Sequence, residues 1–139
     1  MALRRDAKAD LLKSVPLFSG CSKGELRKLA AIADEIDLRE GTVLTREGRS
    51  AREFFVIVEG TVRVSKGSRT LATLGPGDWL GEIALLTKGT RTATATATSP
   101  VVALVIVDRE FRHVVDEIPS IAMKILSSVA ERLQRTPQS

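Results

Sequence analysis

The sequence is poor in the residue types on which many enzymes and nucleic-acid binders depend. Its 139 residues include one cysteine, one histidine and no tyrosine, and aromatic residues make up 4%. A single cysteine excludes an intramolecular disulfide, and a single histidine excludes a metal site built from several histidines. The few aromatic side chains leave little on which single-stranded nucleic acid could stack.

Long apolar runs are also missing. The longest, residues 101–107, is far too short to span a bilayer, and no secretory signal follows Met1. Together with the lone cysteine, Cys21, these absences predict a cytoplasmic protein with no membrane segment.

What is present is typical of one soluble globular domain. The apolar fraction is 43% and the charged fraction 27%, and 139 residues are enough to bury a core without disulfides. The formal net charge of +4 permits an anionic partner. The basic residues are spread along the chain rather than gathered in blocks, so they do not predict a nucleic-acid-binding tail.

The first part of the chain predicts short helices. Residues 6–13 favour a helix that Pro16 ends, and a capping box follows, in which Ser22 is the N-cap and Glu25 reaches back to it. Apolar residues then recur at helical spacing through residues 26–33. We therefore expect an N-terminal helical segment over residues 1–34.

From residue 35 the apolar period changes to two, and glycine-rich turns recur every 8–12 residues. This pattern favours a sandwich, a barrel or a jelly roll. Alternating threonine and alanine in residues 92–98 predict a strand with one small-residue face. The β-branched run 101–107 predicts a strand buried on both faces. The predicted strands include 54–58, 62–64, 70–74, 92–98 and 101–107.

Two helices are expected to close the chain, over residues 108–139. Asp108 is predicted to cap the first, and Pro119 to separate it from an amphipathic helix that starts at Ser120. This last helix could pack on its own domain, on a ligand or on a second subunit. Its apolar stripe comprises Ile121, Ile125, Leu126, Val129 and Leu133.

The segment 81–94 carries residues suited to an anionic ligand. Gly81 lets the backbone approach a ligand closely, and the helix-forming residues 82–86 would present free N–H groups at the start of a helical turn. The loop then returns Arg91 to the same place, where its guanidinium can grip a phosphate with two parallel hydrogen bonds.

Glu82 is the unusual residue beside such a phosphate site. A carboxylate there would repel the phosphate, but it can accept a hydrogen bond from a ribose hydroxyl. The pattern therefore fits a sugar-phosphate pocket. The alternative from the residues alone is a surface ion pair between Glu82 and Arg91 over a short helical turn.

The whole arrangement resembles the cyclic nucleotide-binding domain family, of the catabolite activator and protein kinase A regulatory subunit type. Residues 81–86 followed by 91–94 resemble its phosphate-binding cassette, and residues 75–78 resemble the turn before it. The hairpin from residue 54 to 64 and the helices at both ends follow in the family's order. Leu80 departs from the family, in which many members carry phenylalanine there.

The resemblance implies a mainly β fold with flanking helices. The expected core, residues 35–107, is an eight-stranded β jelly roll (a double-stranded β-helix), and residues 108–139 supply hinge and lid helices. By resemblance, Glu82 takes the ribose 2′-OH and Arg91 the exocyclic phosphate oxygens, while Thr92 can add a hydroxyl contact that favours cGMP in some members. The implied ligand-binding residues are Gly81, Glu82, Ile83, Ala84, Arg91, Thr92 and Ala93.

The resemblance implies a sensor of a cyclic nucleotide, cAMP ahead of cGMP, with no metal and no enzymatic activity. The alternatives are a cGMP sensor and a jelly-roll interaction domain with a vestigial pocket. The sequence holds no common catalytic motif, and no helix-turn-helix follows the last helix, so we expect no specific DNA binding by this chain. A larger effector domain or subunit, or a homodimer through the C-terminal helix, is the expected partner.

Overall fold

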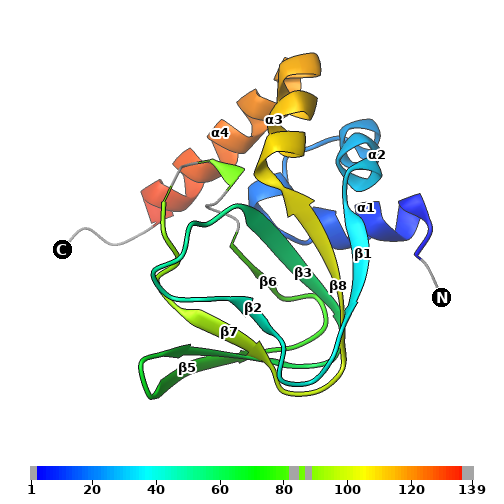
Figure 1. The fold of residues 1–139 in the computed structure, drawn as a ribbon. Helices are drawn as coiled ribbons and strands as arrows, with labels where there is room; N and C mark the ends of the chain where they lie inside the picture. The colour runs from blue at the N-terminus through cyan, green and yellow to red at the C-terminus, as the bar shows by residue number, and fades with distance from the viewer. Residues whose placement is uncertain (1–2, 82–84, 87–88, 136–139) are drawn as a thin grey trace.

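The computed structural model describes residues 3–81, 85–86 and 89–135 (Figure 1). Helices lie at both ends of the chain and strands between them. The helices are α1 (Arg5–Lys13), the 3-10 turn η1 (Pro16–Phe18), α2 (Lys23–Ala31), α3 (Asp108–Glu117) and α4 (Pro119–Arg135). The strands are β1 (Asp34–Leu38), β2 (Val43–Thr45), β3 (Glu53–Glu59), β4 (Val62–Lys66), β5 (Arg69–Leu74), β6 (Trp79–Leu80), β7 (Thr94–Ala97) and β8 (Val101–Val107).

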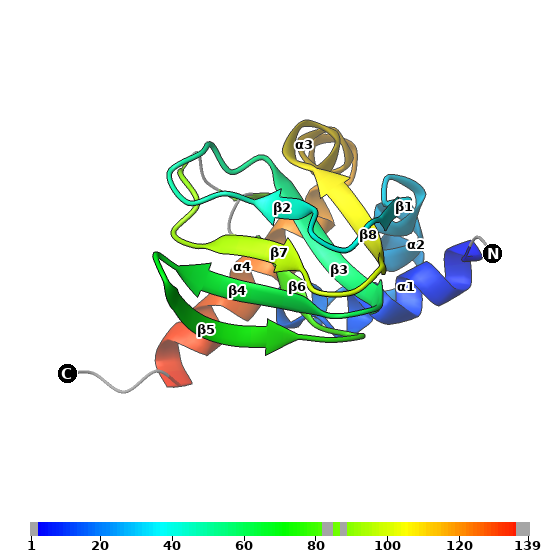
Figure 2. The same cartoon turned by 60° about the horizontal axis from the view of Figure 1, so that its bottom comes forward.

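The strands form two antiparallel sheets. One has the order β1-β8-β3-β6 and the other β2-β7-β4-β5, so strands far apart in sequence are neighbours in both. Figure 2 shows the second sheet crossing in front of the first. The mainly β, eight-stranded jelly roll with helices at both ends is therefore confirmed.

The larger core lies between the first sheet and the helices. Phe18 of η1 is fully buried and meets Phe54 of β3 edge-on, with ring centroids 5.9 Å apart, and Phe111 of α3 at 6.2 Å. Burying each such ring stabilises the fold by about 1.5–3 kcal/mol. These contacts fix both ends of the chain to the sheet that carries β6, and β6 leads directly into the candidate site.

A second, smaller core lies inside the jelly roll. Ala95 and Ala97 of β7 point into it, as the alternation of threonine and alanine predicted, and they pack with Ile57, Val62 and Ala103. Strand β8 contributes residues to both clusters and has no exposed position, which confirms its predicted burial on both faces.

Two expectations for the C-terminal helices were wrong by one residue. Val107 is the extended N-cap of α3, so Asp108 is its first helical residue rather than its cap. Pro119 is the first residue of α4, a position that tolerates proline because its missing N–H has no intrahelical role there. The α4 stripe is split, since Ile121 and Ile125 are buried in the core while Leu126 is 60% exposed.

Candidate functional site

Gly81 follows β6 and adopts a backbone conformation that other residues rarely take. Its φ is +83°, and a Cβ built there would lie 2.6 Å from the Glu53 carbonyl oxygen and closer still to the Arg91 guanidinium. Pairing of Leu80 with Phe55 places this glycine beside β3. Glycine is needed here because an arginine side chain occupies the space that a methyl group would fill.

Arg91 is held from both its backbone and its side chain. Its N–H donates to the Arg49 carbonyl at 2.8 Å, and its own carbonyl accepts from Gly48 N at 2.9 Å. Its guanidinium donates through Nη2 to the Glu53 carbonyl, with the other end of the fork against Gly81. The turn before β3 therefore fixes where this cation lies.

The charge of Arg91 is only partly compensated. Burial lowers the pKa of its half-buried guanidinium, and the nearby Glu53 carboxylate opposes that shift. Among the residues that the structure describes, no carboxylate forms an ion pair with it. A partly desolvated guanidinium that bonds to a neutral carbonyl retains donors and charge for an anion.

A cavity of about 330 Å³ opens beside this arginine. It is lined by strand β2 and the turn that follows, and Arg46 and Arg49 add two more positive charges against the single carboxylate of Glu53. Arg46, Arg49 and Glu53 were not predicted from the sequence to lie at the ligand site. The turn at Glu47 and Gly48 was visible in the sequence, but its pairing with the segment around Arg91 was not.

Of the other residues predicted to bind ligand, Thr92 and Ala93 are described by the structure. Thr92 is exposed, and the carbonyl of Ala93 accepts a hydrogen bond from Thr45 Oγ1 at 3.3 Å, which ties this end of the cassette to β2. The predictions for Glu82, Ile83 and Ala84 concern positions outside the described residues. Leu85, the next described position, is buried in the larger core at 3% exposure.

The start of α4 is bound to α2 through the buried carboxylate of Glu25. This carboxylate accepts hydrogen bonds from Ser120 Oγ, from Lys124 Nζ and, at 2.7 Å, from Ser22 N. Lys124 first, then Ser120 and Ser22, lower the pKa of Glu25 from 4.5 to about 2. This junction holds the start of α4 against α2, and Ile121 and Ile125 of the α4 stripe pack in the core of their own domain.

The isolated functional side chains behave as structural residues. Cys21 is buried, and burial followed by the charge of Glu25 raises the pKa of its thiol to about 11, so it is a poor nucleophile. His113 is exposed on α3. Within residues 3–81, 85–86 and 89–135, no three potential metal-ligating side chains gather, and no helix has the length and apolarity that a membrane span requires.

Comparisons with known proteins agree with this geometry. The family model described as "Cyclic nucleotide-binding domain" matches residues 35–117. The chain is 31% identical over 138 residues to the cGMP-dependent protein kinase, isozyme 1, of Drosophila melanogaster, which covers 94% of this chain and 18% of that protein. It is 39% identical over 101 residues to the cAMP-dependent protein kinase regulatory subunit of Mycosarcoma maydis, which covers 68% of this chain and 19% of that protein.

Among solved structures, the N-terminal domain of a transcriptional regulator from Streptomyces coelicolor A3(2) has the same fold, with a TM-score of 0.84 and 31% identity over 91% of each chain. The sequence thus spans about a fifth of the length of the two curated relatives, whereas it covers nearly all of this solved domain.

Proposed function

The chain belongs to the cyclic nucleotide-binding domain family, and on that basis we propose that it is a regulatory domain that senses cAMP. The observation that carries the proposal is the half-buried Arg91, fixed against Gly81 and the Glu53 carbonyl at the edge of a cavity. A cyclic phosphodiester has one negative charge, which one guanidinium can match with two hydrogen bonds.

In the proposed complex, Arg91 binds the exocyclic phosphate oxygens. The amides of Ile83, Ala84 and Thr92 complete the phosphate cradle, with Gly81 giving access and Ala93 closing the cassette. Glu82 accepts a hydrogen bond from the ribose 2′-OH, as its carboxylate chemistry suits. These side chains bind and orient the nucleotide, and the domain is proposed to regulate an attached or separate effector rather than to catalyse a reaction.

We favour cAMP as the ligand, with cGMP as the alternative. The relative of Mycosarcoma maydis, whose name states cAMP dependence, is 39% identical, and the Drosophila relative, whose name states cGMP dependence, is 31% identical. The exposed hydroxyl of Thr92 is the feature that keeps cGMP open, because it could donate to or accept from a purine substituent.

A short path of backbone contacts supports transmission from the phosphate to α3. Arg91 donates to the carbonyl of Glu53, and the carbonyl of the preceding residue, Arg52, accepts from Asp108 N at 2.9 Å. A phosphate that attracts Arg91 would therefore shift the backbone at Arg52 and Glu53, and with it the start of α3. Because Glu25 holds the start of α4, we place the joint between the two helices, around the non-helical Ile118.

The test is calorimetric titration of the protein with cAMP and with cGMP, after mass spectrometry of any nucleotide that co-purifies. Wild type is expected to bind cAMP more tightly than cGMP, and Arg91→Glu to bind neither. Arg63→Glu, which changes an exposed arginine on β4 by the same charge, should bind like wild type.

Failure of wild type to bind either nucleotide would overturn the sensor and favour the interaction domain. If Arg91→Glu bound as well as wild type, the cassette assignment would be wrong. Unchanged hydrogen exchange of residues 108–135 on ligand binding would leave the proposed sensor intact but remove the proposed motion of α3 about the joint at Ile118.

A further inference from the structure

A second, larger cavity lies on the side of the cassette that faces α3. Its volume is about 620 Å³, and we call it the arginine groove. Its walls come from the segment just before β3, from residues 89–90 before Arg91, and from the end of β8 with the first turns of α3. The polar residues that line it are Ser50, Arg52, Thr90, Asp108, Arg109 and Arg112.

Backbone hydrogen bonds hold the walls of the groove together. Ala51 N donates to the Gly89 carbonyl at 2.9 Å, next to a bridge between Ser50 and Thr90, and Asp108 N donates to the Arg52 carbonyl at 2.9 Å. The groove is therefore formed by segments whose relative positions are already fixed, so a ligand need not order them.

The groove has an excess of positive charge. Three arginines line it, Arg52, Arg109 and Arg112, whereas Asp108 is the one carboxylate among the described residues of its lining. Asp108 Oδ2 lies 3.7 Å from Arg112 Nη2, a spacing too long for a strong ion pair, and the Arg112 side chain is 47% exposed. Among the residues that the structure describes, the groove thus has two more positive charges than negative charges on its walls.

We propose that the arginine groove binds a phosphate group that carries two negative charges, as a phosphomonoester does. A guanidinium can donate two parallel hydrogen bonds to the oxygens of one phosphate, and the hydroxyls of Ser50 and Thr90 in the lining of the groove offer further donors. A bounded cavity of this volume falls in the range of small-molecule sites. The cassette suits a monoanionic cyclic phosphate, whereas the groove suits a dianion.

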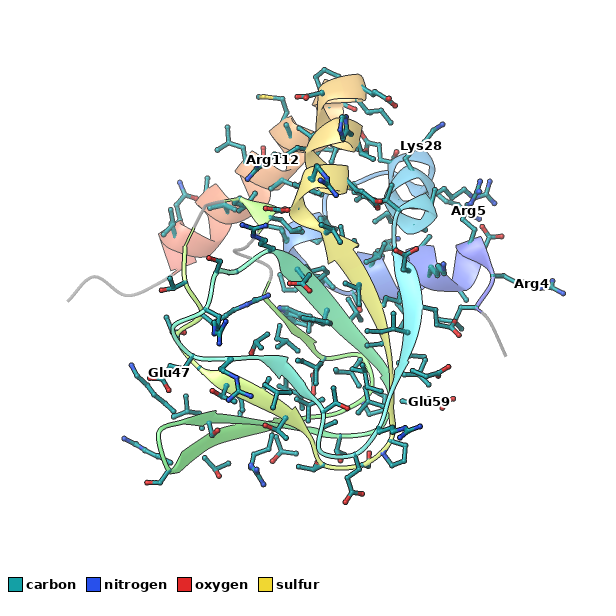
Figure 3. All side chains as sticks on the ribbon, in the orientation of Figure 1. Arg4, Arg5, Lys28, Glu47, Glu59 and Arg112 are labelled. Carbon is teal, nitrogen blue, oxygen red and sulfur yellow. The ribbon has the colours of Figure 1, made fainter. Side chains whose placement is uncertain are left out.

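The arrangement differs from the basic residues elsewhere on the chain. Arg4 and Arg5 are also exposed, but they lie at the far end of α1, well away from Arg112, as Figure 3 shows. They provide a matched control, because replacing both removes the same charge without touching the groove.

The experiment is an NMR titration of the nucleotide-free protein with phenyl phosphate at pH 8, where this ester is a dianion. Saturable amide shifts are expected in residues 50–52, 89–90 and 108–112. The methyl ester of phenyl phosphate is a monoanion and should bind the wild type at least about tenfold more weakly than phenyl phosphate does. The variant Arg109→Gln/Arg112→Gln should bind phenyl phosphate at least about tenfold more weakly than the wild type does. Asp108→Asn should bind about threefold more tightly, because it removes the repelling carboxylate.

The control Arg4→Gln/Arg5→Gln should retain the wild-type affinity within about twofold, and circular dichroism verifies that every variant is folded. The proposal is overturned by shifts outside the groove only, by equal weakening in both double variants, or by equal affinity for the monoanionic ester.

Two peptides identify the source of the phosphate. If a phosphoserine peptide shifts the same amides and binds more tightly than phenyl phosphate, the phosphate is assigned to a phosphorylated protein. If the peptide binds more weakly than phenyl phosphate, the phosphate is assigned to a free metabolite. A glutamate-rich peptide without phosphate that bound more tightly than phenyl phosphate would refute a phosphate site. Because no cyclic nucleotide is present, these outcomes are independent of whether the cassette binds cAMP.

Discussion

Glu25 and Arg91 are two charged side chains that the fold withdraws from water to different degrees, and their charges are treated in opposite ways. Glu25 is 8% exposed and accepts hydrogen bonds from a backbone amide, a serine and a lysine. Arg91 is half-buried and donates to a neutral carbonyl. Among the described residues, the Glu25 carboxylate has a cation and two further hydrogen-bond donors, whereas the Arg91 guanidinium is held in position without an ion-pair partner.

The pKa shifts of Glu25 and Arg91 show the same difference. The partners of Glu25 favour its charged form and lower its pKa to about 2, while burial lowers the pKa of Arg91, which means that its charged form is disfavoured. A compensated charge joins two parts of a fold, and a partly desolvated charge that is only partly compensated is suited to binding a ligand. The comparison therefore separates a structural junction from a binding site without reference to family.

Gly81→Ala is the change expected to have the largest effect on the site. Its Cβ would meet the Arg91 guanidinium and the Glu53 carbonyl, so Arg91 must leave its position. We expect cAMP affinity to fall at least about 100-fold, or about 2.7 kcal/mol, in calorimetry.

Gly77→Ala is the matched control. Gly77 has a φ of +89°, close to that of Gly81, but a Cβ there meets nothing within 4 Å. Gly77→Ala should lose about 1–2 kcal/mol of stability from the left-handed backbone and Gly81→Ala at least as much, but only Gly81→Ala should lose binding. Equal losses of affinity would show that backbone strain, rather than the position of Arg91, controls the site.

Glu25→Gln tests the other side of the comparison. Glutamine keeps the shape and can still cap α2, but it removes the charge that Lys124 and Ser120 stabilise. The free energy of unfolding in urea is expected to fall by about 2 kcal/mol, with cAMP affinity within about threefold of wild type. Glu59→Gln, at the exposed end of β3, should change stability by less than about 0.5 kcal/mol. A Glu25→Gln protein as stable as wild type would mean that the junction contributes no net stability.

The same junction predicts a pH dependence. The folded pKa of Glu25, about 2, lies below the ordinary value of 4.5, so the unfolded chain takes up the proton more readily. The stabilisation is thus complete well above pH 4.5 and is lost as the pH falls from about 5 towards 2. Between pH 6 and pH 3.5, the stability advantage of wild type over Glu25→Gln should shrink by about 1 kcal/mol. An advantage that grew on acidification would contradict the assigned direction.

Local patterns predicted much of both regions. The capping box of Ser22 and Glu25 is confirmed, because it depends on residues three apart, and so is the strand character of the threonine and alanine alternation. The contacts of Glu25 with Ser120 and Lys124 span 95 and 99 residues, and nothing in the sequence pairs them.

The apolar stripe of α4 shows the same limit. Its period predicted a helix with one apolar face, but helical spacing does not say which surface covers that face. The core takes Ile121 and Ile125 and leaves Met123, Leu126 and Leu133 exposed. Likewise, the carbonyl that holds Arg91 was beyond prediction, because every residue has a carbonyl, and only the fold selects that of Glu53.

Thr92→Ala should have the smallest effect and sharpens the comparison within the site itself. Arg91 is proposed to bind the phosphate that cAMP and cGMP share, whereas the exposed hydroxyl of Thr92 is proposed to reach the base. A neutral hydrogen bond contributes about 0.5–1.5 kcal/mol, so cGMP affinity should fall about threefold while cAMP affinity stays within twofold. Thr98→Ala, an exposed threonine just beyond β7, should change neither. If Thr92→Ala weakened both nucleotides equally, the hydroxyl would belong with Arg91 in phosphate binding, and the choice of base would have to lie elsewhere in the pocket.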